Sequence, residues 1–314
     1  MSANTRSRGL SLPVWTRGVY IHPSGYAGPV PGRSFALASY VDAMADWDIP
    51  HPDQAQALTI KVIPCTGPFV LIHYRTPSTL TRQFGCGGYS EPDYHHFAST
   101  FHSGVVVSRP RGPLGLLAVR LRPEAAASLL GERMQYFLDA RIGLDDLFGT
   151  SCVSLLSEML AEASTSAERF ACVESFLAAN LRERRVDPVA CRAAALLRQR
   201  PHLRIHHVAA RLDVSERHLS RSFQAMFGMS PKQFTRIARI ESAWSVLGEG
   251  ASWADIAYAT GFTDQAHMIN DFSEIVGVPP AQLVRPPGNE RRHAANTSDD
   301  AAVVACDEHR IGPV

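Results

Sequence analysis

The spacing of hydrophobic side chains changes along this chain, from short runs in the first half to helical repeats in the second. Runs rich in β-branched and aromatic residues, separated by Pro and Gly, predict strands at 58–63, 69–76, 103–108 and 115–121. A short helix is expected at 123–131, where Pro stands in the first turn and Gly at the end. We therefore expect a β-rich domain over residues 18–149.

Helical spacing begins near residue 151. Apolar side chains recur at the intervals of one helix face, at Val153, Leu156, Met159, Leu160, Phe170, Val173, Phe176, Leu177 and Leu181. Such stripes need a partner surface. Packing within the chain is the favoured interpretation of this helical linker, residues 150–188, and pairing with a second subunit is the alternative.

Residues 189–287 are expected to form an all-α domain, because strand signals are few. Helix stops fall at Pro201, Gly228, Gly248, Gly250, Gly261 and Gly277. The predicted fold is α+β: a β-rich N-terminal regulatory domain, a helical linker and an all-α C-terminal domain. Residues 1–17 are expected to be a flexible N-terminus and residues 288–314 a disordered tail.

Composition narrows the class of protein. A chain of 314 residues is long enough for two domains. No apolar run approaches the roughly 18 residues that span a bilayer, and the first residues lack the apolar stretch of a secretory signal. We expect a cytoplasmic protein with no membrane partner.

The six cysteines stand singly, with no CxxC pair for a metal or a redox couple. We expect reduced thiols. Cys65 and Cys86 are candidates for redox sensors, but isolated cysteines are more often inert small hydrophobes.

Charge is distributed unevenly although the chain as a whole carries only +1. Residues 190–292 contain 13 basic and 9 acidic residues, an excess of four, which weakly favours a polyanionic partner. Nearly all the basic side chains are guanidinium groups, because Lys61 and Lys232 are the only lysines. Guanidinium groups suit flat, bidentate contacts.

A helix-turn-helix unit is predicted at 205–226. A short amphipathic helix at 205–212 is followed by a turn at 213–214 and by Ser215, which is placed to cap a second helix. The core positions of the unit are Val208, Ala209, Leu212, Val214, Leu219 and Phe223. The second helix then directs Arg217, His218, Ser220 and Arg221 outward.

The same pattern repeats at 253–272, with a turn one residue longer. Its core positions are Ile256, Ala257, Phe262, Met268 and Phe272. One such unit is common in helical proteins that bind no DNA, but two joined by a long helix at 231–247 are far more specific. A rigid helix can hold two recognition helices about 34 Å apart, the distance between successive major grooves.

The text of this region resembles the DNA-binding domain of the AraC/XylS family of bacterial transcription regulators. The resemblance covers about a third of the chain and rests on the sequence motifs SxxxLSRxF, FGMSP, IAxxxGFxD and GVPPxQ. It implies a sequence-specific regulator of transcription initiation that binds double-stranded promoter DNA. It also implies a homodimer, a small-molecule effector and RNA polymerase as further partners.

The resemblance places base-reading residues of the first unit at Arg217, Ser220 and Arg221, with His218 beside them. Arginine is the side chain best suited to the O6 and N7 atoms of guanine. In the second unit the matching positions are Ala266, Ile269 and Asn270, and Asp271 stands where the family commonly has Arg. Gln265, His267 and Asn270 remain candidates for DNA contact, whereas Asp271 and Glu274 are expected to repel the phosphate backbone. The first unit is therefore predicted to carry most of the sequence discrimination.

The resemblance implies that the N-terminal domain, often cupin-like in this family, binds an effector or mediates dimers. His73, His95, His96 and His102 raise a second hypothesis, a metal-dependent enzymatic domain with a vestigial DNA-binding module. Cupin metal ligands follow an HxH and Glu arrangement, whereas His95 and His96 are adjacent and point to opposite faces of a strand. A DNA alkylation-repair regulator would need four clustered cysteines. The sequence thus favours a regulator over an enzyme and indicates no metal and no cofactor.

Overall fold

The computed structural model describes residues 19–21, 37–84, 87–90, 94–99, 101, 104–130, 139–181, 186–247, 251–283 and 302–303. The predicted flexible N-terminus, Cys86 and His102 lie outside these residues, as does the C-terminal tail except for residues 302–303. Among the residues described, no helix is both long and apolar enough to cross a membrane.

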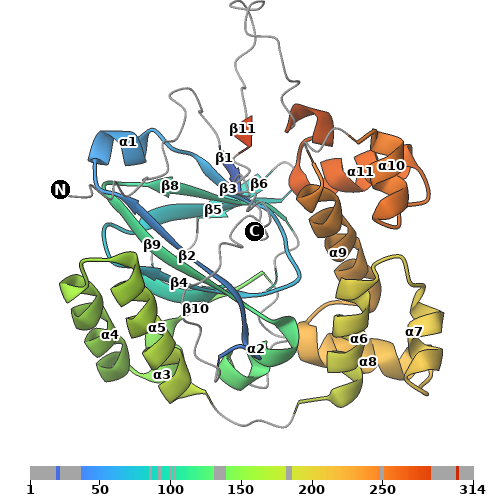
Figure 1. The fold of residues 1–314 in the computed structure, drawn as a ribbon, viewed down its shortest axis with the longest axis horizontal. Helices are drawn as coiled ribbons and strands as arrows, with labels where there is room; N and C mark the ends of the chain where they lie inside the picture. Colours follow the sequence, from blue (N-terminus) through green and yellow to red (C-terminus); the bar gives the residue numbers. More distant parts are fainter. Residues whose placement is uncertain are drawn as a thin grey trace, which may run out of the picture.

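Two β-sheets face each other in the N-terminal half (Figure 1). In the part of the chain that the structure describes, one sheet has the strand order β11-β1-β3-β8-β5-β6 and the other the order β10-β7-β4-β9-β2. The first consists of β11 (Ala302–Val303), β1 (Val19–Ile21), β3 (Ile60–Val62), β8 (Val106–Pro110), β5 (Ser78–Phe84) and β6 (Gly87–Ser90). The second consists of β10 (Arg141–Gly143), β7 (His96–Ser99), β4 (Phe69–His73), β9 (Leu114–Leu121) and β2 (Val41–Ile49).

The four predicted strands correspond to β3, β4, β8 and β9, with ends that differ by a few residues. Strand β2 was not predicted, because its acidic residues interrupt the apolar run. In the structure these acids pair with arginines distant in sequence: Asp42 with Arg198, Asp46 with Arg169 and Asp48 with Arg75. The partners that make β2 a strand of the core sheet are therefore not visible in its local sequence.

A group of three helices packs beside the five-stranded sheet: α3 (Leu144–Phe148), α4 (Thr150–Glu162) and α5 (Ser166–Asn180) (Figure 1). Helix α5 begins at a capping box formed by Thr165 and Glu168. The buried Arg169 of α5 pairs with Asp46 of β2 at 2.9 Å and lies over the ring of Tyr74. This contact fixes α5 against the sheet, so most of the predicted apolar stripes pack within the chain.

The C-terminal part is helical, as predicted, and the fold class is α+β. Its elements are α6 (Pro188–Gln199), α7 (Ile205–Arg211), α8 (Glu216–Phe227), α9 (Pro231–Ser245), α10 (Trp253–Ala259), α11 (Gln265–Val276) and the 3₁₀ helix η3 (Pro280–Gln282). Helix α2 (Pro123–Leu130) leaves the sheet and packs on α6, and α1 (Pro52–Gln56) lies at the opposite end of the sandwich (Figure 1).

The two halves of the chain share one hydrophobic core. Phe101, which is 1% exposed, contacts the rings of Phe227 in α8 and Phe234 in α9, at centroid distances of 5.7 and 6.4 Å. Ile63 of the β3–β4 loop belongs to a second cluster together with Ile240 and Trp244 of α9. The sandwich is thus packed directly against the helices that carry the repeated pattern.

Candidate nucleic-acid interface

The first helix-turn-helix unit consists of α7 and α8. Between them Asp213 adopts a left-handed conformation, with φ 56°, which Asp tolerates better than most residues. Ser215 then accepts a hydrogen bond from the backbone N–H of His218 at 3.1 Å. This cap satisfies one of the free N–H groups at the start of α8 and fixes the point where the recognition helix begins.

Helix α8 is strongly amphipathic. Its inner face carries Leu219 and Phe223, both fully buried, and Phe223 packs on Phe227 and Phe234. The four side chains predicted to contact DNA from this unit all lie on its exposed surface: Arg217, His218, Ser220 and Arg221. The structure therefore places two guanidinium groups, one helical turn apart, on a surface that is open to solvent.

The second unit, α10 and α11, repeats this geometry. Gly261 occupies the position of Asp213 and also has a positive φ, of 82°. A Cβ atom at Gly261 would lie 2.7 Å from Cα of His202, so glycine is required both for the turn and for the close approach. Asp264 then caps α11 by accepting a hydrogen bond from the backbone N–H of His267 at 2.8 Å.

The predicted core positions of both units face inward. Val214 and Leu212 are partly buried, and the other members have exposed fractions of 5% or less: Val208, Ala209, Leu219, Phe223, Ile256, Ala257, Phe262, Met268 and Phe272. Because the same positions are buried in both copies, the outward face of each second helix is defined by the core beneath it.

The predicted contact residues of α11 differ in their surroundings. Gln265 and Asn270 are exposed. His267 is partly buried: its ring meets the ring of Phe262 edge-on at 5.5 Å, and its Nε2 lies 3.6 Å from Oδ2 of Asp271. His267 is therefore packed against its own unit more closely than the other candidates.

The acidic residues of α11, which are expected to repel the phosphate backbone, are both paired with one arginine in the structure. Arg236 of α9 pairs with Oδ1 of Asp271 at 2.7 Å and with both carboxylate oxygens of Glu274, at 2.7 and 3.2 Å. Asp271 is only 7% exposed. These hydrogen bonds raise the pKa of Arg236 above its ordinary value and offset much of the negative charge on this side of α11.

Helix α9 holds the two units together. It begins at a capping box made by Ser230 and Gln233. Toward its other end Trp244 stacks on Phe272 of α11, with a centroid distance of 5.9 Å, and Arg239 donates a hydrogen bond to the backbone carbonyl of Pro201 at 2.9 Å. The sequence pattern did not identify Arg236 or Arg239 as functional, because their partners lie in other helices.

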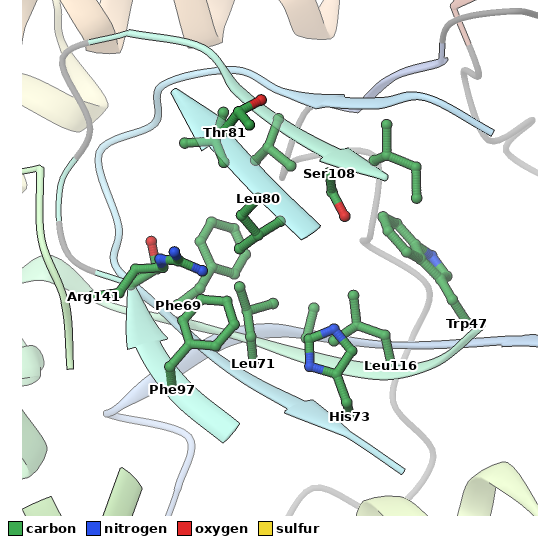
Figure 2. Close-up of a pocket in the computed structure, with 15 residues that line it drawn as sticks. Trp47, Phe69, Leu71, His73, Leu80, Thr81, Phe97, Ser108, Leu116 and Arg141 are labelled. Atoms are coloured by element: carbon green, nitrogen blue, oxygen red, sulfur yellow. The ribbon is translucent and has the colours of Figure 1, made fainter. Parts of the chain in front are cut away.

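A cavity lies between the two sheets of the sandwich, with a volume of about 60 Å³. Figure 2 shows side chains from both sheets pointing into it. Its walls are mostly apolar, and the polar groups include the Arg141 guanidinium, which lies over the ring of Phe97 at 5.2 Å, and the His73 imidazole. The wall residues include Trp47, Phe69, Leu71, Leu80, Phe97, Leu116 and Ala118.

The histidines of the sandwich occupy separate environments. Nδ1 of His73 lies 2.8 Å from the backbone carbonyl of His95, so Nδ1 carries the proton. Nε2 of His96 lies 2.8 Å from the Ser157 hydroxyl, which itself donates to the Val153 carbonyl. Nε2 of His96 is therefore the donor, and its buried Nδ1 has no hydrogen-bond partner. Burial lowers the pKa of His73 and lowers that of His96 to about 4.

No group of three His, Cys, Asp or Glu side chains in the described ranges is arranged to hold a metal ion. Cys65 is buried, and burial raises the pKa of its thiol to about 12. At neutral pH this thiol is protonated, which is the unreactive form.

These features define a module of two helix-turn-helix units joined by one helix, each with an exposed recognition helix. A family model described as "Helix-turn-helix domain" matches residues 208–285. This part of the chain is an AraC-type helix-turn-helix domain.

Two curated relatives each match a part of the chain. The chain is 41% identical over 54 residues to the "Uncharacterized HTH-type transcriptional regulator YbfI" of Bacillus subtilis, a match that covers 17% of this chain and 20% of that protein. It is 29% identical over 105 residues to "Regulatory protein ada" of Salmonella typhimurium, covering 33% and 30%. The chain thus spans less than a third of the length of either relative.

Solved structures with similar folds include ToxT from Vibrio cholerae, with 12% identity, a TM-score of 0.44, and coverage of 78% of this chain and 97% of that one. The DNA-binding domain of AdpA, solved in complex with a target DNA, is 26% identical over 30% of this chain and 87% of its own, with a TM-score of 0.29.

Proposed function

We propose that this protein is a sequence-specific DNA-binding transcription regulator. The observation that carries the proposal is the pair of exposed recognition helices, α8 and α11, held by one connecting helix. The helix-turn-helix family match supports it. A recognition helix fits the major groove, where each base pair presents a distinct pattern of donors and acceptors.

The first unit carries most of the base discrimination in this proposal. Arg217 and Arg221 are exposed and belong to a capped, well-packed helix, so each guanidinium can reach a base edge without disturbing the core. Ser220 and His218 supply further polar groups beside them. A bidentate arginine–guanine contact contributes about 1–3 kcal/mol of discrimination against the wrong base.

In this proposal the second unit serves mainly to position the protein on the DNA duplex. Gln265 and Asn270 are exposed, and in this proposal they contact a base or a phosphate, with His267 near the start of the same helix. Arg236 reduces the repulsion that Asp271 and Glu274 would exert on phosphates. Fewer long basic side chains on this surface predict weaker sequence discrimination than in the first unit.

The sandwich is the regulatory part of the proposed protein. Its cavity favours a small, largely apolar effector, since most of the wall residues are aromatic or aliphatic and the polar ones are His73, Thr81, Ser99, Ser108 and Arg141. Effector binding repositions the readers on promoter DNA, and RNA polymerase is then recruited or blocked.

Helix α4 is the proposed dimer contact. Leu155 and Met159 project from it with exposed fractions of 57% and 39%, and Cys152 lies exposed on the same face. A two-fold axis would place this apolar stripe against its own copy and remove it from water. The proposed functional unit is therefore a homodimer with four recognition helices.

In vitro selection tests the proposal. Duplexes bound from a random pool at about 0.15 M salt would be sequenced for the full-length protein and for the variant Arg217→Ala/Arg221→Ala. We expect a defined motif with the wild type and its loss with the variant. Binding that shows no motif, or a motif that the variant retains, would overturn the assignment of α8 as the base-reading helix.

A further inference from the structure

Glu241 of α9 reaches into the sandwich. Thr66, fully buried in the β3–β4 loop, donates two hydrogen bonds to Oε2 of Glu241, from its hydroxyl at 2.6 Å and from its backbone N–H at 3.2 Å. Oε1 pairs with Nη2 of Arg120 in β9. Both oxygens of an acid from the helix-turn-helix module are thus held by the sheet domain.

Arg120 stands next to the cavity. Position 120 pairs with Phe69 across the β4–β9 ladder, and Phe69 and Ala118 line the cavity from the same face of the sheet. Burial disfavours the charged guanidinium, but the carboxylates of Glu241 and Asp42 outweigh it and raise the pKa of Arg120. The guanidinium therefore stays charged between the cavity wall and α9.

The loop that carries Thr66 is packed tightly on Arg120. A Cβ atom at Gly67 would lie 2.4 Å from the carbonyl oxygen of Leu121 and 3.2 Å from Nε of Arg120. Cys65, on the other side of Thr66, packs with Phe69 and Ala118. The residues that hold Glu241 and the residues that form the cavity wall are accordingly one packed unit.

The cavity in this arrangement is small. Its volume is about 60 Å³, whereas an engineered apolar cavity that binds benzene has a volume of about 150 Å³. A ligand with even one ring can enter only if the walls move apart. Because protein interiors are close-packed, displacement of Phe69 and Ala118 is passed to Arg120 and to the loop at Thr66.

We propose that Arg120, Thr66 and Glu241 form a latch, a set of hydrogen bonds and an ion pair that forms only when the cavity is contracted. Ligand binding in the cavity and attachment of α9 to the sandwich therefore oppose each other. This inference rests on the proposed regulatory role of the cavity. Because α9 connects the two helix-turn-helix units, release of the latch detaches from the sandwich the helix that sets the separation of the recognition helices α8 and α11. The Arg198–Asp42 pair and the Phe101–Phe227 contact keep the domains attached when the latch is open.

The test measures binding of an uncharged apolar dye, N-phenyl-1-naphthylamine, to the full-length protein by fluorescence titration. Glu241→Gln and Thr66→Val each weaken the latch with little change in side-chain volume. We expect either variant to bind the dye at least about fivefold more tightly than the wild type. Arg122→Gln is the matched control, because Arg122 pairs with Asp42 within the sheet domain, and we expect wild-type dye affinity.

A cavity-filling substitution, Ala118→Leu, distinguishes dye binding in the cavity from dye binding elsewhere on the protein. Added to Glu241→Gln, it is expected to abolish the gain in dye affinity, while circular dichroism verifies the fold. Dye affinity that is equal in wild type and latch variants, or a gain that survives Ala118→Leu, overturns the latch. If the dye binds in the cavity with the same affinity in the wild type and the latch variants, the latch is wrong but the cavity can still bind an effector. The proposed DNA-binding function is tested separately by the in vitro selection.

Discussion

Among single residues, the proposed DNA recognition depends on a few side chains whose surroundings differ. Arg217 and Arg221 are solvent-exposed, whereas Arg236 is engaged by Asp271 and Glu274. The same residue type therefore has two tasks in this module. The first two arginines are available for DNA, and the third maintains the position of α11.

Replacing Arg221 with Ala should weaken binding to the selected DNA site by about 1–3 kcal/mol and relax the preference for one base pair. The reason is the loss of a bidentate donor that no neighbour replaces. Competition binding against single-base variants of the site measures both effects. Arg192→Ala, which removes an exposed arginine from α6, is the matched control, and an equal loss in that variant would contradict the assignment.

Replacing Arg236 with Met should lower the free energy of unfolding by about 2 kcal/mol, because the mostly buried Asp271 loses its counter-charge. The double variant Arg236→Met/Asp271→Asn should be more stable than the single one. Urea unfolding measures the difference, with Lys232→Met of the same helix as control. A single variant as stable as wild type would show that Arg236 does not support α11.

Histidine protonation gives a pH dependence with a definite sign. The pKa of His96 is lowered from 6.5 to about 4 and that of His73 is also lowered, so the unfolded chain binds more protons below pH 6.5. Stability should therefore fall as pH decreases from 6.5 toward about 4, by at most about 1.4 kcal/mol per pH unit for each histidine.

His96→Gln should reduce this slope, since the ring with the unpaired Nδ1 is removed. The exposed His51, which is not among the groups that lower either pKa, provides the control variant His51→Gln, which should keep the wild-type slope. The slope is measured from the free energies of unfolding of the wild type and both variants at several pH values. A slope that His96→Gln leaves unchanged would assign the effect to other groups.

At the scale of elements, α4 is distinct because two large apolar side chains on it are exposed. Leu155→Asp/Met159→Asp should raise the dissociation constant of the proposed dimer at least about tenfold, since two apolar contacts are lost on each side of the axis. Sedimentation equilibrium measures the constant. Ser154→Asp/Ala161→Asp adds the same charge on another exposed part of α4, and equal weakening by this control would place the dimer contact elsewhere.

The elements also show why some of the structure is predictable from sequence. Helices α7, α8, α10 and α11 are specified locally: Ser215 and Asp264 cap their own helices, and Gly261 supplies its own turn. The acids of strand β2 pair with arginines from the turn after β4, from α5 and from α6, and Arg236 pairs with acids of α11. Local patterns predict the first group and miss the second, because the partners meet only after the chain has folded.

At the scale of the whole molecule, the sandwich and the DNA-binding module are packed as one body. The aromatic contacts of Phe101 and the ion pairs of Glu241 and Arg198 join them. No repeat or motif in the sequence indicates this contact, because its residues are scattered from position 42 to position 241. An effector in the cavity would therefore lie only a few side chains from the helix that connects the readers.

In the proposed function, one protomer reads two successive major grooves through α8 and α11. The most direct test of this proposal is the affinity for the selected DNA site after insertion of five base pairs between the segments read by the two helices. Five base pairs rotate one segment by half a helical turn relative to the other, which a rigid α9 cannot accommodate. We therefore expect at least a tenfold loss of affinity, and no loss when five base pairs are inserted outside the site. Unchanged affinity for the internal insertion would contradict two-groove reading.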